Sequence, residues 1–320
     1  MKKFITQFIL FCLPALIAAY AFDVFVSKYL KESNSFAKKE YPVWNAIRDS
    51  KVNSDIVIYG SSRAWVHIDP KMISDSLNVS CYNLGINGHN FWLQDLRHRL
   101  LLKNNSKPKL IIHSLDAFTL QKNEDLYNAE QFLPYMLWNN QIKEATISYN
   151  GFPFVDYEIP IIRYYGRQKA INTAFELYLN PQDNPIQRIS GYQGQARVWN
   201  SDFEKAKSKM KAYNVKIDTP SLHLFEDYLK ECQSKKIQIV LVYTPEYIEG
   251  QKFVKNRDSI ITMYNKFSKE YKIPFYDYSN DTMSYNKKYF YNSLHLNKKG
   301  AELFTHKLIN TIKASNSNYK

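Results

Sequence analysis

Short runs of consecutive apolar residues recur along the chain, separated by longer segments that carry apolar residues on one face only. Such alternation is typical of an α/β fold, in which helices connect parallel strands. Three of the runs consist of uninterrupted Ile, Val and Leu, which indicates strands that are buried on both faces of a sheet. The pattern predicts a mostly parallel, five-stranded sheet with strands at residues 55–59, 80–84, 109–113, 237–243 and 273–276.

Amphipathic segments between these runs predict the connecting helices. Thr219 before Pro220 is typical of a helix start, with a capping residue followed by proline at the first helical position. Asn297 stands where a cap is expected before the last helix. The predicted helices cover residues 70–77, 90–103, 220–235, 257–271 and 298–312.

Residues 118–215 interrupt the alternation, because they contain no clear strand of the same type and are rich in Tyr, Phe, Trp and Asn. We interpret this segment as an insertion or lid. Its aromatic side chains either stack on a sugar ring or close a local core, and the sequence leaves both alternatives open. The candidates for sugar contact are Tyr135, Trp138, Tyr164, Tyr165 and Trp199.

The N-terminus departs from the composition of a soluble domain. Behind Lys2 and Lys3, residues 4–22 form a run of 19 uncharged residues. A helix of that length, at about 1.5 Å per residue, nearly crosses a hydrocarbon core of roughly 30 Å. The run is longer than the apolar region of most signal peptides, although residues 19–21 (Ala-Tyr-Ala) resemble a cleavage site. We expect a retained transmembrane signal anchor over residues 4–26, with cleavage as the alternative, then a linker over 27–51 and the main domain over 52–320.

Charge and cysteine content exclude several classes of function. The formal net charge of +13 comes mainly from lysines scattered along the chain, without the Arg-rich or aromatic-interleaved cluster of a nucleic-acid-binding face. A basic exterior also suits anionic lipid or anionic glycan. Cys81 and Cys232 leave one disulfide open, and no spacing of His, Cys and carboxylates is typical of a zinc site. We therefore expect no nucleic-acid partner, no metal and no cofactor.

Two segments carry candidate chemistry. The first is an apolar strand that runs directly into Gly60-Ser61-Ser62-Arg63, where a serine on the turn is exposed at the carboxyl end of a strand. The second is the loop before the last helix, where His295 is a candidate general base. Either segment alone is weak evidence, since small residues often mark turns and a lone histidine is more often a surface or capping residue.

Together, the two segments resemble the SGNH hydrolase superfamily, also called GDSL-type esterases. Gly60-Ser61-Ser62 matches the nucleophile block, with Ser61 in place of the usual Asp and Ser62 in the nucleophile position. Residues 83–88 (Asn-Leu-Gly-Ile-Asn-Gly) match the second block, which implies that the Gly88 N–H contributes to an oxyanion hole together with Ser62. The resemblance further implies a flavodoxin-like three-layer sandwich.

The chain departs from the family at two positions. After the third strand, the family places an Asn that completes the oxyanion hole, whereas this sequence offers His113, Ser114 and Asp116; we take Asp116 as the candidate. The last block reads D-x-x-H in the family and Asn292-Ser-Leu-His295 here.

The second departure leaves open what orients His295. An Asn amide oxygen accepts a hydrogen bond from the imidazole, but it stabilises the cation less than a carboxylate does. The alternatives are a backbone carbonyl or a carboxylate such as Asp277 or Asp281. An active Ser62–His295 pair and a degenerate, non-catalytic site therefore both remain hypotheses.

The anchor, the nucleophile turn and the long insertion are similar to exported SGNH-like proteins that acylate envelope polymers, such as the D-alanine transfer protein of teichoic acid assembly and alginate O-acetylation proteins. The resemblance implies a serine esterase or O-acyltransferase that acts on cell-envelope or exported polysaccharide. It implies an acyl donor, delivered by a membrane protein in one alternative, and a single-pass location on the extracytoplasmic side. Arg63 is a candidate contact for an anionic sugar or phosphate, with a salt bridge in the first helical turn as the alternative.

Overall fold

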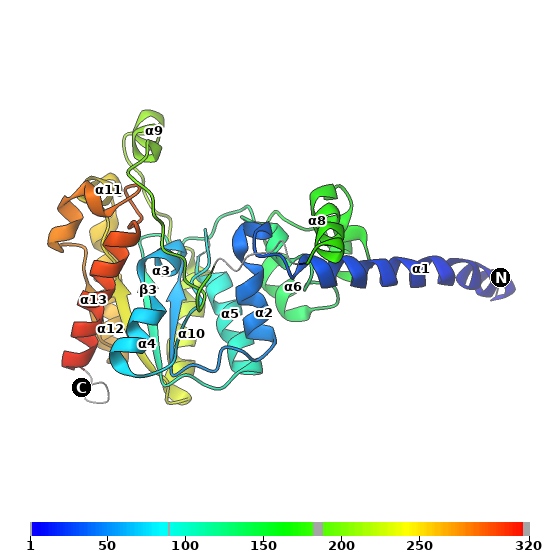
Figure 1. Cartoon of the computed structure of the whole chain (residues 1–320), viewed down its shortest axis with the longest axis horizontal. Coiled ribbons are helices and arrows are strands. Elements are labelled where there is room, and N and C mark those ends of the chain that lie inside the picture. The colour runs from blue at the N-terminus through cyan, green and yellow to red at the C-terminus, as the bar shows by residue number, and fades with distance from the viewer. Residues whose placement is uncertain (1, 89, 182–187, 316–320) are drawn as a thin grey trace. The chain divides into compact units, whose positions relative to one another are not determined.

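The computed structural model describes residues 2–88, 90–181 and 188–315 (Figure 1). The chain divides into two compact units. Unit 1 consists of Met1–Asn45 and Asn123–Gln187, and unit 2 consists of Ala46–Lys122 and Arg188–Lys320. Each unit therefore contains two stretches of chain that are distant in sequence.

Unit 2 contains a five-stranded sheet in the order β2-β1-β3-β4-β5, in which every neighbouring pair is parallel. Ile56 of β1 pairs with Cys81 of β2 on one side and with Leu110 of β3 on the other. The predicted parallel sheet is confirmed, and each strand lies within two residues of its expected bounds. The strands are β1 (Ile56–Gly60), β2 (Cys81–Asn83), β3 (Leu110–Leu115), β4 (Gln238–Tyr243) and β5 (Phe275–Asp277).

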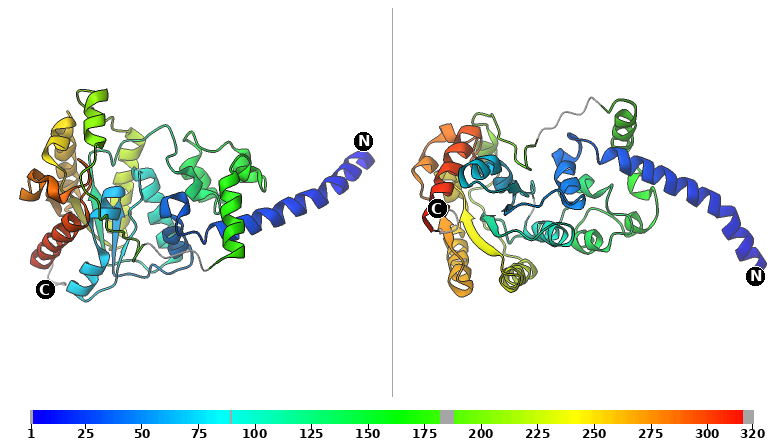
Figure 2. Two further views of the ribbon diagram at one scale, coloured as in Figure 1. Left: turned by 45° about the horizontal axis from the view of Figure 1, so that its top comes forward. Right: turned by 60° about the horizontal axis from the view of Figure 1, so that its bottom comes forward.

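Helices cover both faces of the sheet (Figures 1 and 2). Alternate strand residues, such as Ile58 and Ile112, share a core with Phe304 and Leu308 of the last helix. The intervening residues face the other way, where Tyr59 meets His98 in ring contact. One layer consists of α3 (Ser62–His67), α4 (Pro70–Leu77) and α13 (Lys298–Ser315), and the opposite layer includes α5 (Phe91–Asn104), α10 (Thr219–Ser234) and α12 (Arg257–Tyr271).

The predicted helices of unit 2 are confirmed, with small differences at their ends. Thr219 lies inside α10, and Asp218 is the capping residue because its carboxylate accepts from the Ser221 N–H. Asn297 caps α13 as expected, through its side-chain oxygen and the Gly300 N–H at 3.0 Å. Unit 2 also contains α9 (Asp202–Lys209), α11 (Ile248–Phe253), η4 (Thr282–Tyr285) and η5 (Lys287–Tyr289). Its two cysteines, Cys81 and Cys232, are buried and free.

Unit 1 is built around the N-terminal helix α1 (Lys2–Leu30). Its C-terminal half packs on α8 (Gln168–Leu179), where Phe25 and Phe175 lie 5.0 Å apart between ring centroids. The expected linker over residues 27–51 is instead part of the fold: Leu30, Tyr41 and Trp44 are buried. Helix α2 (Tyr41–Arg48) begins in unit 1 and ends in unit 2. The other short elements of unit 1 are η1 (Phe36–Lys39), η2 (Ala129–Phe132), α6 (Asn140–Thr146), α7 (Val155–Glu158) and η3 (Ile162–Tyr164).

The expected insertion over residues 118–215 divides between the two units. Of its candidate sugar-stacking residues, Tyr135 and Tyr164 are buried in unit 1, which is the local-core alternative. Trp138 and Tyr165 are exposed in unit 1. Trp199 belongs to unit 2 and packs edge-on against Tyr247, with 4.9 Å between ring centroids.

Candidate active site

The turn after β1 places Ser62 at the first position of α3. Gly60 has φ of +143°, and a Cβ at this position would lie 2.6 Å from the Ser114 carbonyl oxygen, so only glycine fits. Ser61 is the N-cap of α3, and its hydroxyl accepts from the Arg63 N–H. The same hydroxyl donates to Asp116 Oδ2 at 2.5 Å. Ser61 and Asp116 therefore tie the nucleophile turn to the end of β3.

Ser62 and His295 meet although 233 residues separate them in the sequence. Ser62 Oγ lies 2.8 Å from His295 Nε2, and His295 Nδ1 lies 3.0 Å from Asn292 Oδ1. The three side chains form a hydrogen-bonded chain with the geometry of a nucleophile, a base and an orienting group.

The backbone fixes the orientation of the Asn292 amide. Asn292 Oδ1 also accepts from the N–H groups of Leu294, at 3.1 Å, and His295, at 2.9 Å. An amide nitrogen cannot accept these bonds, so the oxygen must face the imidazole. The proton of neutral His295 is therefore on Nδ1, and the lone pair on Nε2 accepts from the Ser62 hydroxyl.

The carboxylates that were alternatives to Asn292 are engaged elsewhere. Asp281 accepts from Lys307 Nζ at 2.6 and 2.7 Å, and Asp277 accepts from the Ser279 N–H at 2.9 Å. Asn292 is thus the side chain that orients His295 in the structure. The catalytic roles of Ser62, His295 and Asn292 belong to the proposal below.

Burial and a nearby cation lower the pKa of His295 from its usual value to about 3. Loss of hydration is the larger cause, and the positive charge of Arg63 acts in the same direction. His295 is consequently neutral at neutral pH and available as a base.

Arg63 points into the protein and away from solvent. The residue is 2% exposed, and its guanidinium donates to Thr244 through Nε at 3.0 Å and forms an ion pair with Glu246. The structure therefore places Arg63 in the salt bridge that was the alternative to substrate contact. A buried, paired guanidinium is not available to an anionic ligand, so the expected substrate-binding role of Arg63 is corrected.

His67 connects this ion pair to the loop that carries His295. The Leu296 N–H donates to His67 Nε2 at 3.0 Å, so the other ring nitrogen carries the proton and donates to Thr244 Oγ1 at 2.8 Å. The edge of one histidine ring faces the other, with 6.0 Å between the centroids of His67 and His295. Burial lowers the pKa of His67 well below its usual value, which keeps this link uncharged.

The segment that follows β2 runs beside the nucleophile turn. The Ile86 N–H donates to the Gly60 carbonyl oxygen at 3.0 Å, which extends the β1–β2 pairing past Asn83. Asn83 Nδ2 donates to the carbonyl oxygens of Ala64 and Ile68, so its side chain holds α3 against this segment. Gly88 follows in a turn with φ of +75°, and its N–H as an oxyanion donor stays a prediction.

Asp116 does not provide the donor that was expected of it. Its carboxylate accepts from the Ser61 hydroxyl and from the Phe118 N–H, at 2.5 and 2.7 Å. A carboxylate in this position is an acceptor and would repel a developing oxyanion. The expectation is therefore corrected: Asp116 positions the nucleophile turn. Its neighbour His113 is bonded to Tyr228 and Gln94 in the opposite helix layer.

Solved structures similar to this chain share its fold class. A GDSL-like lipase from Bacteroides thetaiotaomicron has 13% sequence identity and a TM-score of 0.42, and the match covers 91% of this chain and 99% of that chain. An acetyl xylan esterase, AlAXEase, has 14% identity and a TM-score of 0.38, with 80% of this chain and 99% of that chain covered. No family model matches the sequence, and no curated protein does either.

The sequence did not single out several residues that support the site. The Tyr291 ring stacks on the His295 ring, with 5.3 Å between the centroids. The Arg197 guanidinium lies over the Tyr291 ring, 5.7 Å from its centroid. Tyr291 stands directly before the block that contains Asn292, and Thr244 and Glu246 lie just after the carboxyl end of β4. These positions in the sequence could have indicated that the three residues lie near the site. His67 and Arg197 had no such signal, because long-range packing alone brings them to the site.

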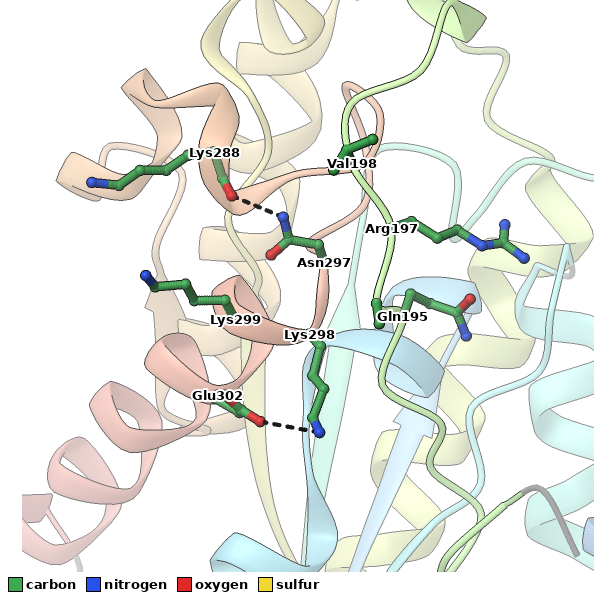
Figure 3. A pocket seen from close by; sticks show the side chains of 9 residues that line it. Gln195, Arg197, Val198, Lys288, Asn297, Lys298, Lys299 and Glu302 are labelled. Atoms are coloured by element: carbon green, nitrogen blue, oxygen red, sulfur yellow. Dashed lines mark hydrogen bonds and ion pairs between the residues drawn. The ribbon is translucent and has the colours of Figure 1, made fainter.

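A basic pocket of about 560 Å³ opens beside the loop that carries His295 (Figure 3). Lys298, at the start of α13, reaches Glu302 at 3.9 Å, and Asn297 donates to the Lys288 carbonyl oxygen at 2.8 Å. Four cationic side chains and one carboxylate line the pocket, which suits an anionic ligand. Its lining residues are 195–198, Lys288, Asn297, Lys298, Lys299 and Glu302.

Proposed function

We propose that the protein is a membrane-anchored, extracytoplasmic serine esterase or O-acyltransferase of the SGNH type, acting on cell-envelope or exported polysaccharide. The hydrogen-bonded chain from Ser62 Oγ through His295 to Asn292 Oδ1 carries this proposal. It brings together the two blocks that resemble the superfamily, at the carboxyl end of a parallel strand where α/β folds hold their ligands.

In the proposed reaction, His295 Nε2 takes the proton of Ser62 as Oγ attacks an ester carbonyl. The oxyanion is held by backbone N–H groups of the Ser62 turn and of Gly88. The imidazolium then gives its proton to the leaving alkoxide, and an acyl-Ser62 ester remains. Attack by water makes the protein an esterase, whereas attack by a sugar hydroxyl makes it a transferase.

Two further features support the anchoring and the substrate class. Among residues 2–88, 90–181 and 188–315, one helix, α1, is long and apolar enough to cross a membrane. Lys2 and Lys3 at its N-terminal end favour export of the residues that follow. The basic pocket beside the His295 loop favours an anionic polymer as acceptor.

A fluorophosphonate probe tests the reactive pair. The full-length protein should be labelled at Ser62, Ser62→Ala should not be labelled, and His295→Gln should react much more slowly. Ser106→Ala, at an exposed serine, is the matched control and should be labelled like the wild type. Acetylated anionic and neutral oligosaccharides, compared as substrates and as acceptors, then distinguish hydrolysis from transfer.

A non-catalytic, polysaccharide-binding role is the second candidate, because Asp116 cannot provide the oxyanion donor of the third block. If folded wild-type protein binds an envelope glycan but Ser62 is not labelled, the enzyme proposal is wrong and this role replaces it.

A further inference from the structure

Unit 1 exposes a set of apolar side chains close to helix α1. Each of the six is between 37% and 59% exposed, although they come from three short elements and the loops beside them. A group of this kind on a small unit is unusual for a surface that faces only water. We call these residues the apolar collar: Trp138, Phe154, Val155, Ile159, Ile162 and Phe175.

The collar is attached to one turn of α1. Tyr20 stacks on Trp138 with 5.5 Å between ring centroids, and Phe22 meets Phe175 at 6.2 Å. The Ile161 N–H donates to Asp23 Oδ2 at 2.7 Å, which brings the chain around Ile159 to the same level. Two collar residues, Trp138 and Phe175, and the chain between Ile159 and Ile162 therefore contact α1 at residues 20–23.

The length of the apolar helix places the membrane boundary at the same level. Residues before this turn project from the unit, and Phe11 is 82% exposed. A core of roughly 30 Å requires about 20 residues at about 1.5 Å each, so a span that begins at Phe4 ends near Asp23. A helix from Phe4 to Ala19 spans about 24 Å, so the turn that the collar contacts is needed to complete the crossing of the core.

The first acidic residue of α1 lies at the same level and is bound by protein side chains. Asp23 is 1% exposed and forms a buried ion pair with Arg163, with Oδ1 and Nη2 at 2.6 Å. Val26 and Leu30, which follow on the helix, are fully buried in unit 1. From Asp23 onward, one side of α1 is thus part of the core of unit 1. The Asp23 carboxylate is paired with a protein cation and is not exposed to lipid.

We propose that the collar lies in the lipid headgroup region of the bilayer, so that unit 1 rests on the membrane surface and α1 connects it rigidly to the membrane-spanning residues. The proposal rests on the membrane anchoring proposed above. Trp and exposed aliphatic side chains next to a membrane-crossing helix have the chemistry of an interfacial surface. Since the end of α1 is part of the core of unit 1, the height of this unit above the membrane is set by the fold.

Lipid-attached quenchers measure this depth directly. Variants of the full-length protein with one added, exposed cysteine, made in a Cys12→Ser background, carry an environment-sensitive fluorophore and are reconstituted into discs of phosphatidylethanolamine and phosphatidylglycerol. Cys81 and Cys232 are buried and stay unlabelled in the folded protein. Val155→Cys and Ile159→Cys report on the collar, and Leu10→Cys reports on the exposed apolar part of α1. Lys28→Cys is the matched control, about 12 Å beyond Tyr20 along the helix.

With a nitroxide near the headgroup end of the lipid chain, we expect both collar labels to be quenched several-fold more than the Lys28 label. If Leu10 is quenched by a nitroxide near the methyl end of the lipid chain and the collar labels are not quenched by the one near the headgroup, the helix is in the bilayer but the collar proposal is wrong; a collar that binds a membrane protein gives this result in pure lipid. If neither nitroxide quenches Leu10, the anchoring is wrong. Near-ultraviolet circular dichroism checks that each variant is folded. The fluorophosphonate reaction of Ser62 tests the proposed enzyme function independently of the collar.

Discussion

Asn292 has the position that a carboxylate occupies in the family that the sequence resembles. Its side-chain oxygen accepts from three N–H groups, those of Leu294, His295 and the imidazole, so the His295 tautomer is already correct. What an amide lacks is the negative charge that stabilises an imidazolium.

We expect the carboxylate of Asn292→Asp to raise the pKa of His295 by about one unit, which stabilises the imidazolium by about 1.4 kcal/mol. The rate on a small acetyl ester should therefore increase by up to about tenfold. The control Asn292→Leu keeps the size but removes the acceptor, and should lower kcat by a factor of about 10² or more because the tautomer is no longer held. An Asp variant no faster than the wild type would show that charge at this position is not limiting.

The lowered pKa of His295 gives a pH profile with a displaced acidic limb. Because the imidazole stays neutral down to about pH 3, kcat/KM for the same ester should not fall between pH 7 and 5 as it would for an ordinary histidine. In Asn292→Asp the added charge raises this pKa, so the limb should move toward higher pH. A wild-type limb near pH 6.5 would contradict the burial of His295.

At the scale of elements, the site depends on how closely α3 approaches the segment after β2. Gly85 makes this approach possible, because a Cβ there would lie 2.4 Å from the Trp65 backbone nitrogen. Trp65 lies on the helix that begins with Ser62, so a displacement at Gly85 is transmitted to the nucleophile.

Gly85→Ala should destabilise the protein by roughly 1–3 kcal/mol, the range for overpacking, and lower the rate of fluorophosphonate labelling as well. Gly194→Ala is the control, because its added Cβ would meet only side-chain atoms, of Tyr192 and Lys298, and none nearer than 3.0 Å. Urea unfolding followed by fluorescence measures the first effect. Equal stability of the two variants would contradict this account of Gly85.

At the scale of the whole molecule, unit 2 buries several neutral histidines. Burial lowers the pKa of His113, His98 and His295 to about 3, and that of His67 well below its usual value. In the unfolded chain these groups titrate near 6.5, so between about pH 3 and 6.5 the unfolded state binds more protons. Their contribution to stability is complete above pH 6.5 and is lost as the pH falls toward 3. Buried carboxyl groups with raised pKa values, such as Asp95 at about 6, oppose this trend.

His113→Gln isolates one of these contributions. Its free energy of unfolding should fall less than that of the wild type between pH 6.5 and 4.5, by up to about 1.4 kcal/mol per pH unit for the one proton removed. His223→Gln, at an exposed position of α10, is the matched control. Denaturant unfolding at several pH values measures the slopes, and identical slopes for all three proteins would rule out the buried, neutral state of His113.

The sequence by itself determined the strands and helices of unit 2, because uninterrupted apolar runs and capping residues act locally and leave few alternatives. It also placed Ser62 directly after a strand and His295 directly before the last helix, and a parallel sheet brings such connections together at the carboxyl ends of its strands. Only the tertiary structure decided which partner orients His295, that Arg63 is buried in an ion pair, and that Asp116 accepts instead of donating. The sequence also could not join residues 1–45 with 123–187, since the contact of Asp23 with Arg163 spans 140 residues and leaves no periodic signal. Such pairings depend on which surfaces remain to be buried once the sheet has formed, and this is a property of the folded chain as a whole.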